Sequence, residues 1–387
     1  MGRWAPMTMS GDLEFHAFCL TQTGTRLDQF ARAIKRRVRP GDTVVDLGAG
    51  SGILSFLACM AGARRVYAIE AGESLSFAEL LATAGGFQDR IEFIRKPSTH
   101  VVLPERVDAI VADIHDTFGL QQNGLAAFID ARERFLKPGG ALIPSAIELL
   151  VAPVEAPDLY RTTIEVWKQT IHGVNLSPLR ALAVNSVNAA RFEPAQLLAA
   201  PASLATIDLT DVQAPHAGGT ALSHCTRDGT LHGVCGCFRT TLADGLVLGN
   251  VPGDSATTNF AQAFFPVDAP LSIAAGAPVS IDVDTHDGSV ARWQVEVTRR
   301  GGEPPVRFDH STFQSLAFPA DGLRRQSSDY RPRLTPWGAM ERALLEQFDG
   351  TRPASELEAW LTERFGDTLP SRREAAAMLK AIIERCG

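Results

Sequence analysis

Short apolar runs alternate with helical stretches between residues 42 and 111. The runs typical of buried parallel strands are TVVDLG (43–48), RVYAIE (65–70), IEFI (91–94) and VDAIVA (107–112). The segments between them, SGILSFLACMAGA (51–63) and ESLSFAELLATAGG (73–86), have helical spacing, and the second ends on glycine. This alternation predicts a doubly wound, Rossmann-like parallel sheet that binds its ligand beyond the carboxyl ends of the strands.

The pattern changes after FLKPGGALIP (135–144). Many short strand-like runs follow, separated by Gly, Pro and Asp turns; they include LHGVCGCF (231–238), GLVLGN (245–250), APVSIDVDT (277–285) and ARWQVEVTR (291–299). They predict an antiparallel sheet or barrel over residues 147–318. A helical insertion at about 160–192 interrupts the strands, and its apolar residues with few charges indicate an arm that needs a partner surface.

Helical patterns also mark both ends of the chain. Residues 12–36 predict one or two helices that end before Pro40 and Gly41. Residues 1–40 are assigned to N-terminal helices that cap the bound ligand, and residues 41–146 to the Rossmann-like domain. Residues 319–336, rich in Pro, Arg and Ser, predict a linker. Residues 337–387 predict three helices with a small winged-helix-like core, separated at FDGTRP (348–353) and FGDTLP (365–370).

Composition narrows the classes of partner. The chain has 37 Lys and Arg residues against 44 Asp and Glu residues, a formal net charge of −7, so we expect no nucleic-acid partner. No apolar run approaches the roughly 20 residues of a membrane span, and the N-terminus lacks the apolar region of a signal peptide. Six cysteines without CxxC spacing predict neither a metal site nor disulfides. We therefore expect a soluble, cytoplasmic protein without a membrane partner.

The stretch VVDLGAGSGILS (44–55) is the first with clear chemical content. Gly48, Gly50 and Gly52 follow an apolar run that contains a single acid, Asp46. A glycine-rich turn from strand to helix lets a ligand approach the backbone and the helix N-terminus. The dinucleotide fingerprint needs a third glycine where this chain has Ile53, and Asp46 would lie against the pyrophosphate of a dinucleotide.

A carboxylate at this turn suits a cationic ligand. S-adenosyl-L-methionine, with its sulfonium and ammonium groups, is the predicted cofactor. Glu70, at the end of the next strand, is placed to accept hydrogen bonds from both ribose hydroxyls. A dinucleotide site and a purely structural glycine turn remain the alternatives.

Four segments in order along the chain resemble the protein arginine methyltransferases. They are residues 44–71, ARERFLKPGGALIP (131–144), residues 167–209 from WKQTIHG to ATIDL, and TTNFAQAFFPVDAPLSIAAGAPVSI (257–281). The resemblance covers roughly residues 12–300. It implies a seven-stranded Rossmann-like methyltransferase domain, an antiparallel β-barrel, and a homodimer formed through the helical arm.

The resemblance also implies roles for individual residues. Arg26 matches the arginine that binds the methionine carboxylate of the cofactor. The positions that match the rest of the cofactor site are Asp46, Gly48, Gly50, Glu70, Ala71 and Ser98. Asn259 and Phe260 stand where the family has a histidine and a tryptophan near the substrate. The expected product is S-adenosyl-L-homocysteine.

The catalytic loop, ADIHDTFGLQQNGL (112–125), departs from the family. Arginine methyltransferases use two glutamates, nine residues apart, to hold the acceptor guanidinium; here these positions are Asp113 and Gln122. A guanidinium has five donors, no acceptor and a permanent charge. Gln122 offers one acceptor oxygen, and its amide donors would face other donors.

Two readings of this loop stay open. In the first, Asp113 and Asp116 together replace the carboxylate pair. In the second, His115 serves as general base for a hydroxyl, thiol or other less basic acceptor. The predicted catalytic residues are accordingly Asp113, His115, Asp116 and Gln122. The predicted acceptor is a side chain of a peptide or protein, or an amino-acid-derived metabolite, with arginine nitrogen first. The alternatives are O- or N-methylation of a small natural product and a catalytically silent fold relative.

The C-terminal stretch LLEQFDGTRPASELEAWL (344–361) is similar to peptide-chaperone domains of the pyrroloquinoline-quinone type. Those domains hold leader peptides of ribosomally made natural products. The resemblance implies a leader-peptide role for residues 337–387, and a plain structural cap is the alternative.

Overall fold

The computed structural model describes residues 13–14, 16–17, 23–113, 115–119, 123–255, 258, 260–286, 290–299, 303–317, 322, 324–325, 327–369 and 371–386. Two predicted site residues, Gln122 and Asn259, lie outside the described residues. The chain divides into two compact units, Met1–Ala317 and Phe318–Gly387. The three domains predicted within residues 1–318 thus belong to the first unit.

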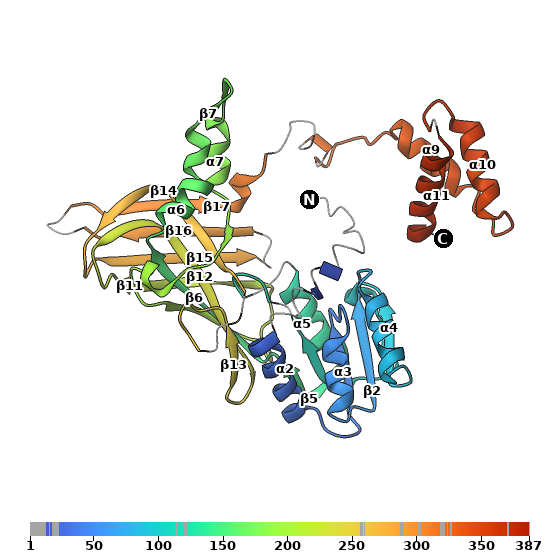
Figure 1. The fold of residues 1–387 in the computed structure, drawn as a ribbon, viewed down its shortest axis with the longest axis horizontal. Coiled ribbons are helices and arrows are strands. Elements are labelled where there is room, and N and C mark those ends of the chain that lie inside the picture. Colours follow the sequence, from blue (N-terminus) through green and yellow to red (C-terminus); the bar gives the residue numbers. More distant parts are fainter. Residues whose placement is uncertain are drawn as a thin grey trace. The chain divides into compact units, whose positions relative to one another are not determined.

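The first unit begins with a parallel sheet in the order β3-β2-β1-β4-β5. Its strands are β1 (Thr43–Leu47), β2 (Arg65–Glu70), β3 (Ile91–Arg95), β4 (Val107–Ala112) and β5 (Leu136–Ile143), and its helices are α2 (Thr23–Arg37), α3 (Ile53–Met60), α4 (Leu75–Gly85) and α5 (Gly124–Phe135) (Figure 1). All five residues of β1 are buried, which explains why its sequence is mostly apolar, with Asp46 as the single acid. The chain leaves β1 toward β2 and β3 and returns to β4 on the other side. The sheet therefore has its switch point, the usual place for a ligand, between β1 and β4.

The structure corrects the predicted number of strands in this sheet. Its described residues give five parallel strands, not seven. After β5 the chain enters β6 (Ala146–Val154), which pairs antiparallel with β10 and β12 of the next sheet. Buried apolar positions of β6 pack in that second sheet, so β6 does not extend the parallel sheet.

Residues 146–311 form two antiparallel sheets, which we call the β region. One has the order β10-β6-β12-β14-β9, with β13 paired to β12, and the other has the order β11-β15-β16-β17. The remaining strands are β9 (Asn188–Ala190), β10 (Ala202–Asp208), β11 (His216–His224), β12 (Gly229–Ala243), β13 (Leu246–Gly249), β14 (Gln262–Ile273), β15 (Pro278–His286), β16 (Val290–Val297) and β17 (Val306–Ser311). The strand-like runs predicted in this region correspond to β12, β13, β15 and β16.

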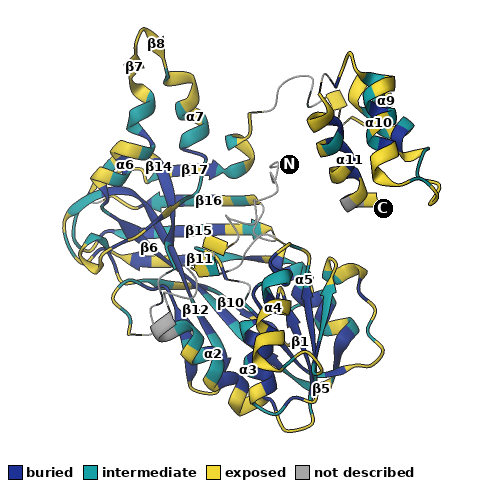
Figure 2. Ribbon diagram, turned by 45° about the vertical axis from the view of Figure 1, so that its right-hand side comes forward, coloured by how far each residue is buried: buried dark blue, intermediate teal, exposed yellow. Residues whose placement is uncertain are grey.

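An arm leaves the β region between β6 and β9. It consists of α6 (Pro157–Thr163), a hairpin of β7 (Thr170–Ile171) and β8 (Val174–Asn175), and α7 (Arg180–Ala183). The arm projects from the β region with this hairpin at its tip (Figure 1). The tip is exposed, in contrast to the buried strands below it (Figure 2).

One continuous apolar core joins the parallel sheet to the β region. Helix α2 contributes Phe30, Ala33 and Ile34, all fully buried, and contacts α3, β5, β12 and β13. Helix α2 thereby packs against both the parallel sheet and the β region. No helix within the described part of the chain is long and apolar enough to cross a membrane.

The second unit has a core of its own. Helices α9 (Pro336–Leu345), α10 (Ala354–Phe365) and α11 (Arg372–Cys386) bury residues that include Leu344, Leu357, Leu361 and Leu379. Thr335 caps α9 by accepting a hydrogen bond from the Gly338 backbone N–H at 3.0 Å. The three predicted C-terminal helices are confirmed.

Candidate active site

The turn after β1 requires its glycines. The backbone φ angles of Gly48, Gly50 and Gly52 are 74°, 52° and 78°, in the left-handed region. A Cβ atom on Gly52 would also lie 2.8 Å from Cβ of Ala78 on α4, so the turn and α4 pack closely there. At Gly48, by contrast, an added Cβ would meet no atom of a described residue within 4 Å. The turn is tight on the helix side and open at Gly48.

Asp46 is an acid inside the central strand. Its side chain is buried, and its Oδ2 accepts a hydrogen bond of 2.7 Å from Ser55 Oγ on α3. Oδ1 is also buried and has no hydrogen-bond partner within the described residues. Burial raises the pKa of Asp46 from 3.8 to about 6, although the Ser55 hydrogen bonds oppose the rise. Such a carboxylate favours a ligand that brings a donor or a positive charge.

The Glu70 carboxylate holds the glycine turn in place. Its Oε2 accepts a hydrogen bond from the Gly50 N–H at 3.1 Å, and its Oε1 accepts one from the Gly72 N–H at 2.7 Å. Each carboxylate oxygen retains capacity to accept a second hydrogen bond. Ala71 follows as an exposed residue, and Ser98 begins a short 3-10 turn after β3.

Asp113 directly follows β4 and faces the N-terminal turn of α2. Its Oδ2 pairs with the Arg26 guanidinium, whose carbon also lies 5.0 Å from the centre of the Phe260 ring. The side chains of Arg26 and Asp113 are 21% and 12% exposed, so solvent screens this pair only in part. The structure thus brings together three predicted site residues from distant parts of the chain.

His115 is enclosed by the catalytic loop and the β region. Its Nδ1 lies 2.8 Å from Asp113 Oδ1, and its Nε2 lies 2.8 Å from Thr240 Oγ1 on β12. The His115 side chain has no exposed surface. Burial, and secondarily the Arg26 charge, lower the pKa of His115 from 6.5 to about 3. Both ring nitrogens are engaged, which does not support the general-base reading of this residue.

Asn250 is a polar contributor to the site that sequence reasoning missed. This fully buried residue follows β13, and its Nδ2 donates hydrogen bonds of 2.8 Å to the carbonyl oxygens of Thr117 and Ala261. Its Oδ1 accepts from the Phe238 N–H, also at 2.8 Å. One side chain therefore ties the catalytic loop to the β region. A lone asparagine among turn residues gives no signal of this role in the sequence.

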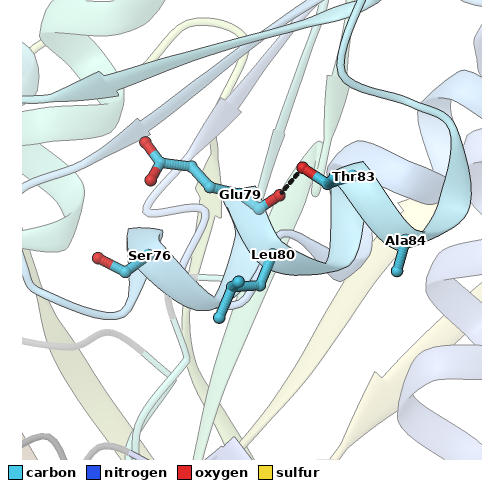
Figure 3. Close-up of a pocket in the computed structure, with 5 residues that line it drawn as sticks. All are labelled: Ser76, Glu79, Leu80, Thr83 and Ala84. Carbon is cyan, nitrogen blue, oxygen red and sulfur yellow. Dashed lines mark hydrogen bonds between the residues drawn. The ribbon is translucent and has the colours of Figure 1, made fainter.

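Asp116 is exposed and accepts a hydrogen bond from the Thr117 N–H at 2.6 Å. It does not join the cluster of Asp113, Arg26 and His115 through any hydrogen bond between described residues. A separate hollow of about 550 Å³ lies on the outer side of α4 and is lined by Ser76, Glu79, Leu80, Thr83 and Ala84 (Figure 3). Thr83 Oγ1 donates to the Glu79 carbonyl oxygen at 3.0 Å within this hollow. None of its residues belongs to the cluster around Asp46 and Asp113.

Comparison with known proteins gives two family matches. Residues 145–298 match the arginine methyltransferase oligomerization subdomain, and residues 25–149 match the ribosomal protein L11 methyltransferase family. Protein arginine N-methyltransferase 6 of Xenopus laevis is 31% identical over 242 residues, which cover 59% of this chain and 71% of that protein. The chain belongs to the protein arginine methyltransferase family. It is accordingly an S-adenosyl-L-methionine-dependent methyltransferase.

Other members of the family extend the likeness. A probable histone-arginine methyltransferase CARM1 of Oryza sativa subsp. indica is 33% identical over 258 residues, 62% of this chain and 48% of that protein. The Trypanosoma brucei PRMT1 enzyme-prozyme heterotetrameric complex with AdoHcy has a TM-score of 0.66 at 20% identity, covering 74% of this chain and 94% of that chain. A crystal structure of Arabidopsis thaliana protein arginine methyltransferase 10 has a TM-score of 0.63 at 21% identity, over 74% and 94% of the two chains. These structures support the methyltransferase fold followed by antiparallel sheets.

The residues of this chain fit the family's cofactor. Asp46 offers a buried carboxylate oxygen without a partner among described residues, and Gly48 borders open space. A ligand with cationic and hydroxyl groups supplies the donors that these features need.

Proposed function

We propose that this chain transfers methyl groups from S-adenosyl-L-methionine to a nitrogen of an arginine side chain in a peptide or protein. One observation carries the proposal: the Asp113 carboxylate, at the switch point of the sheet, already pairs with a guanidinium, that of Arg26. A site that holds one guanidinium has the charge and the acceptor oxygens to hold another. The names of the relatives, arginine N-methyltransferases, point to the same acceptor.

The chain's residues divide between the two ligands. Asp46, Gly48, Gly50, Glu70 and Ser98 hold the adenosine and methionine parts of the cofactor, and Arg26 binds its carboxylate. When bound, the cofactor supplies an electrophilic methyl group. Asp113 accepts hydrogen bonds from the acceptor guanidinium and orients one nitrogen, so its contribution is mainly positioning. Phe260, whose ring lies beside the Arg26 guanidinium, covers the acceptor site. Asp116 is exposed, and its carboxylate accepts a hydrogen bond only from the Thr117 N–H among the described residues, so we assign it no contact with the acceptor. The role of Gln122 stays a prediction from the sequence.

The test is transfer of a labelled methyl group to a peptide with one arginine, with the same peptide carrying lysine as the matched control. Label in the arginine peptide alone supports the proposal. Binding of S-adenosyl-L-homocysteine without transfer to any peptide or protein acceptor overturns it and indicates a silent relative. Transfer only to small molecules overturns it in favour of a natural-product methyltransferase.

We also propose that the chain forms a homodimer through its arm. The arm tip exposes Ile171 and Val174, which are 43% and 60% exposed. Helix α4 exposes two further apolar side chains, Leu80, which lines the hollow of Figure 3, and Leu81. Apolar surfaces of this kind are buried in an assembly. The edge strands β10 and β11 contact each other, and β14, which is next to the short edge strand β9, contacts the edge strand β17. We infer that the two sheets of the β region close into the predicted barrel.

The second unit is proposed to bind the leader segment of a peptide substrate. Its support is the resemblance of residues 344–361 and the presence of a core separate from that of the first unit.

A further inference from the structure

We propose that His115 is a positioning residue that connects the Asp113 carboxylate to Thr240 of β12 and so sets the direction in which Asp113 faces the acceptor. The proposal rests on the assignment of Asp113 as the acceptor-binding carboxylate. It replaces the general-base role that the sequence allowed for this histidine.

Geometry gives His115 a connecting position. Nδ1 and Nε2 each lie 2.8 Å from a partner oxygen, and the partners belong to different parts of the fold. Asp113 directly follows a parallel strand, whereas Thr240 lies near the C-terminal end of the antiparallel β12. The imidazole thus spans the junction between the methyltransferase sheet and the β region.

The identity of the partners determines which nitrogen carries the proton. The Asp113 carboxylate is an acceptor only, so Nδ1 must donate. Burial keeps the pKa of His115 near 3, and the ring is therefore neutral with Nε2 unprotonated. Nε2 then accepts the hydrogen bond of the Thr240 hydroxyl. The donors and acceptors of these three side chains are all paired in only one arrangement: the Thr240 hydroxyl donates to Nε2, and Nδ1–H donates to the Asp113 carboxylate.

Aromatic packing fixes the plane of the imidazole ring. Phe238 stacks on it with ring centres 5.2 Å apart and an angle of 14° between the planes. Phe30 and Phe260 flank it at 6.3 and 6.0 Å. Because these aromatic rings pack around it, the His115 imidazole cannot rotate toward a substrate. It therefore holds Asp113 Oδ1 in one place. Arg26 acts on the other oxygen, Oδ2, of the same carboxylate.

The loop does not depend on His115 alone. Asn250 independently holds the Thr117 carbonyl oxygen at 2.8 Å. A substitution at residue 115 should consequently change the direction of Asp113 while the loop stays attached. This separation makes a positioning role testable apart from a folding role.

Three variants, measured in the full-length protein with an arginine peptide, test the proposal. In His115→Phe the ring and its stacking remain but both hydrogen bonds are lost, and we expect kcat to fall about 100-fold, as for a group displaced by about 1 Å. In His115→Asn the amide still donates to Asp113, so we expect at least about one tenth of the wild-type kcat. Thr240→Val removes only the remote partner and should lower kcat about tenfold. Dissociation constants for S-adenosyl-L-homocysteine should stay within about twofold of wild type.

A general base predicts a different pattern. In that case His115→Asn would be as inactive as His115→Phe, and Thr240→Val would match the wild-type enzyme. Either result overturns the proposal, as does loss of cofactor binding in all three variants, which would indicate a structural role.

A second readout does not depend on activity. In ¹⁵N NMR of histidine-labelled protein, His115 should show a neutral ring with the proton on Nδ1 throughout pH 5 to 8, and Thr240→Val should change its Nε2 shift. Titration near pH 6.5 or a proton on Nε2 overturns the proposal. If wild-type protein transfers no methyl group to arginine, the proposed function fails. The NMR result then still decides whether His115 holds Asp113.

Discussion

Asp46, a proposed cofactor-binding residue, has a cost for folding. Folding buries its carboxylate in β1 and raises its pKa from 3.8 to about 6, so the folded protein takes up a proton more readily than the unfolded chain. The stability that this acid contributes is present below pH 3.8 and is lost as the pH rises through 6. The full difference corresponds to at most about 3 kcal/mol in the free energy of unfolding.

Asp46→Asn should therefore stabilise the cofactor-free protein relative to wild type at pH 7.5. The gain in the free energy of unfolding should be up to about 3 kcal/mol larger at pH 7.5 than at pH 4. Urea unfolding of the first unit at both pH values measures this difference. Asp244→Asn, at a 96% exposed side chain, is the control. An equal effect of Asp46→Asn at both pH values would contradict the assigned pKa.

Arg26 is expected to bind the cofactor through its guanidinium. Hydrogen bonds between charged groups contribute about 1.5–3 kcal/mol, so Arg26→Ala should weaken binding of S-adenosyl-L-homocysteine by about 10- to 100-fold. Titration calorimetry measures the dissociation constant. Arg36→Ala is a matched control on the same helix, because Arg36 donates only to the Asp244 carbonyl oxygen at the surface within the hydrogen bonds described. Equal affinities of Arg26→Ala and wild type would remove Arg26 from the site.

At the scale of elements, local patterns were sufficient to predict β1 to β4, the helices between them and the glycine turn. Fully buried strands and left-handed glycines leave unbroken apolar runs and fixed glycine spacing in the sequence. The position of Asp113 also follows, because it stands directly after a strand whose place in the sheet is set by topology.

Contacts between distant elements were not predictable from the same patterns. Thr240 is 125 residues from His115, and Asn250 is 133 residues from Thr117. These pairs depend on the register between β12 and β6 and on how the β region packs against α2, neither of which a local pattern specifies. The number of parallel strands was not predictable either: the resemblance implied seven, and the described residues form five.

The arm is the element that determines the predicted dimer. Val174→Lys places a charge on the 60% exposed apolar tip and should convert a dimer into a monomer. Light scattering coupled to size exclusion measures the mass of the particle against 41.6 kDa for one chain. Leu222→Lys, at a 61% exposed site on β11, should leave the dimer intact. A monomeric wild-type protein, or a dimeric Val174→Lys variant, would contradict the proposal.

At the scale of the whole molecule, the chain is two units with separate cores. The core of helices α9, α10 and α11 contains no residue of the first unit. Both family matches, residues 25–149 and 145–298, lie within the first unit. The role of the second unit is open to direct test.

Removal of residues 318–387 should leave the binding of S-adenosyl-L-homocysteine within about twofold of the full chain, because the proposed cofactor residues and the core around them lie in Met1–Ala317. Transfer to a short arginine peptide should also persist. If the second unit binds a leader segment, transfer to a peptide that carries such a segment should decline. Loss of cofactor binding on truncation would contradict the independence of the two units.

The proposed function depends most on Asp113, through its charge, its place directly after β4 and its proposed contact with the acceptor. The most direct test compares wild type with Asp113→Asn for transfer of labelled methyl from S-adenosyl-L-methionine to an arginine peptide. We expect the wild-type enzyme to label the arginine of the peptide. For Asp113→Asn we expect kcat/KM to be about 10- to 100-fold lower, with unchanged cofactor binding. Equal transfer by both proteins, or transfer by neither while the cofactor binds, would contradict the account.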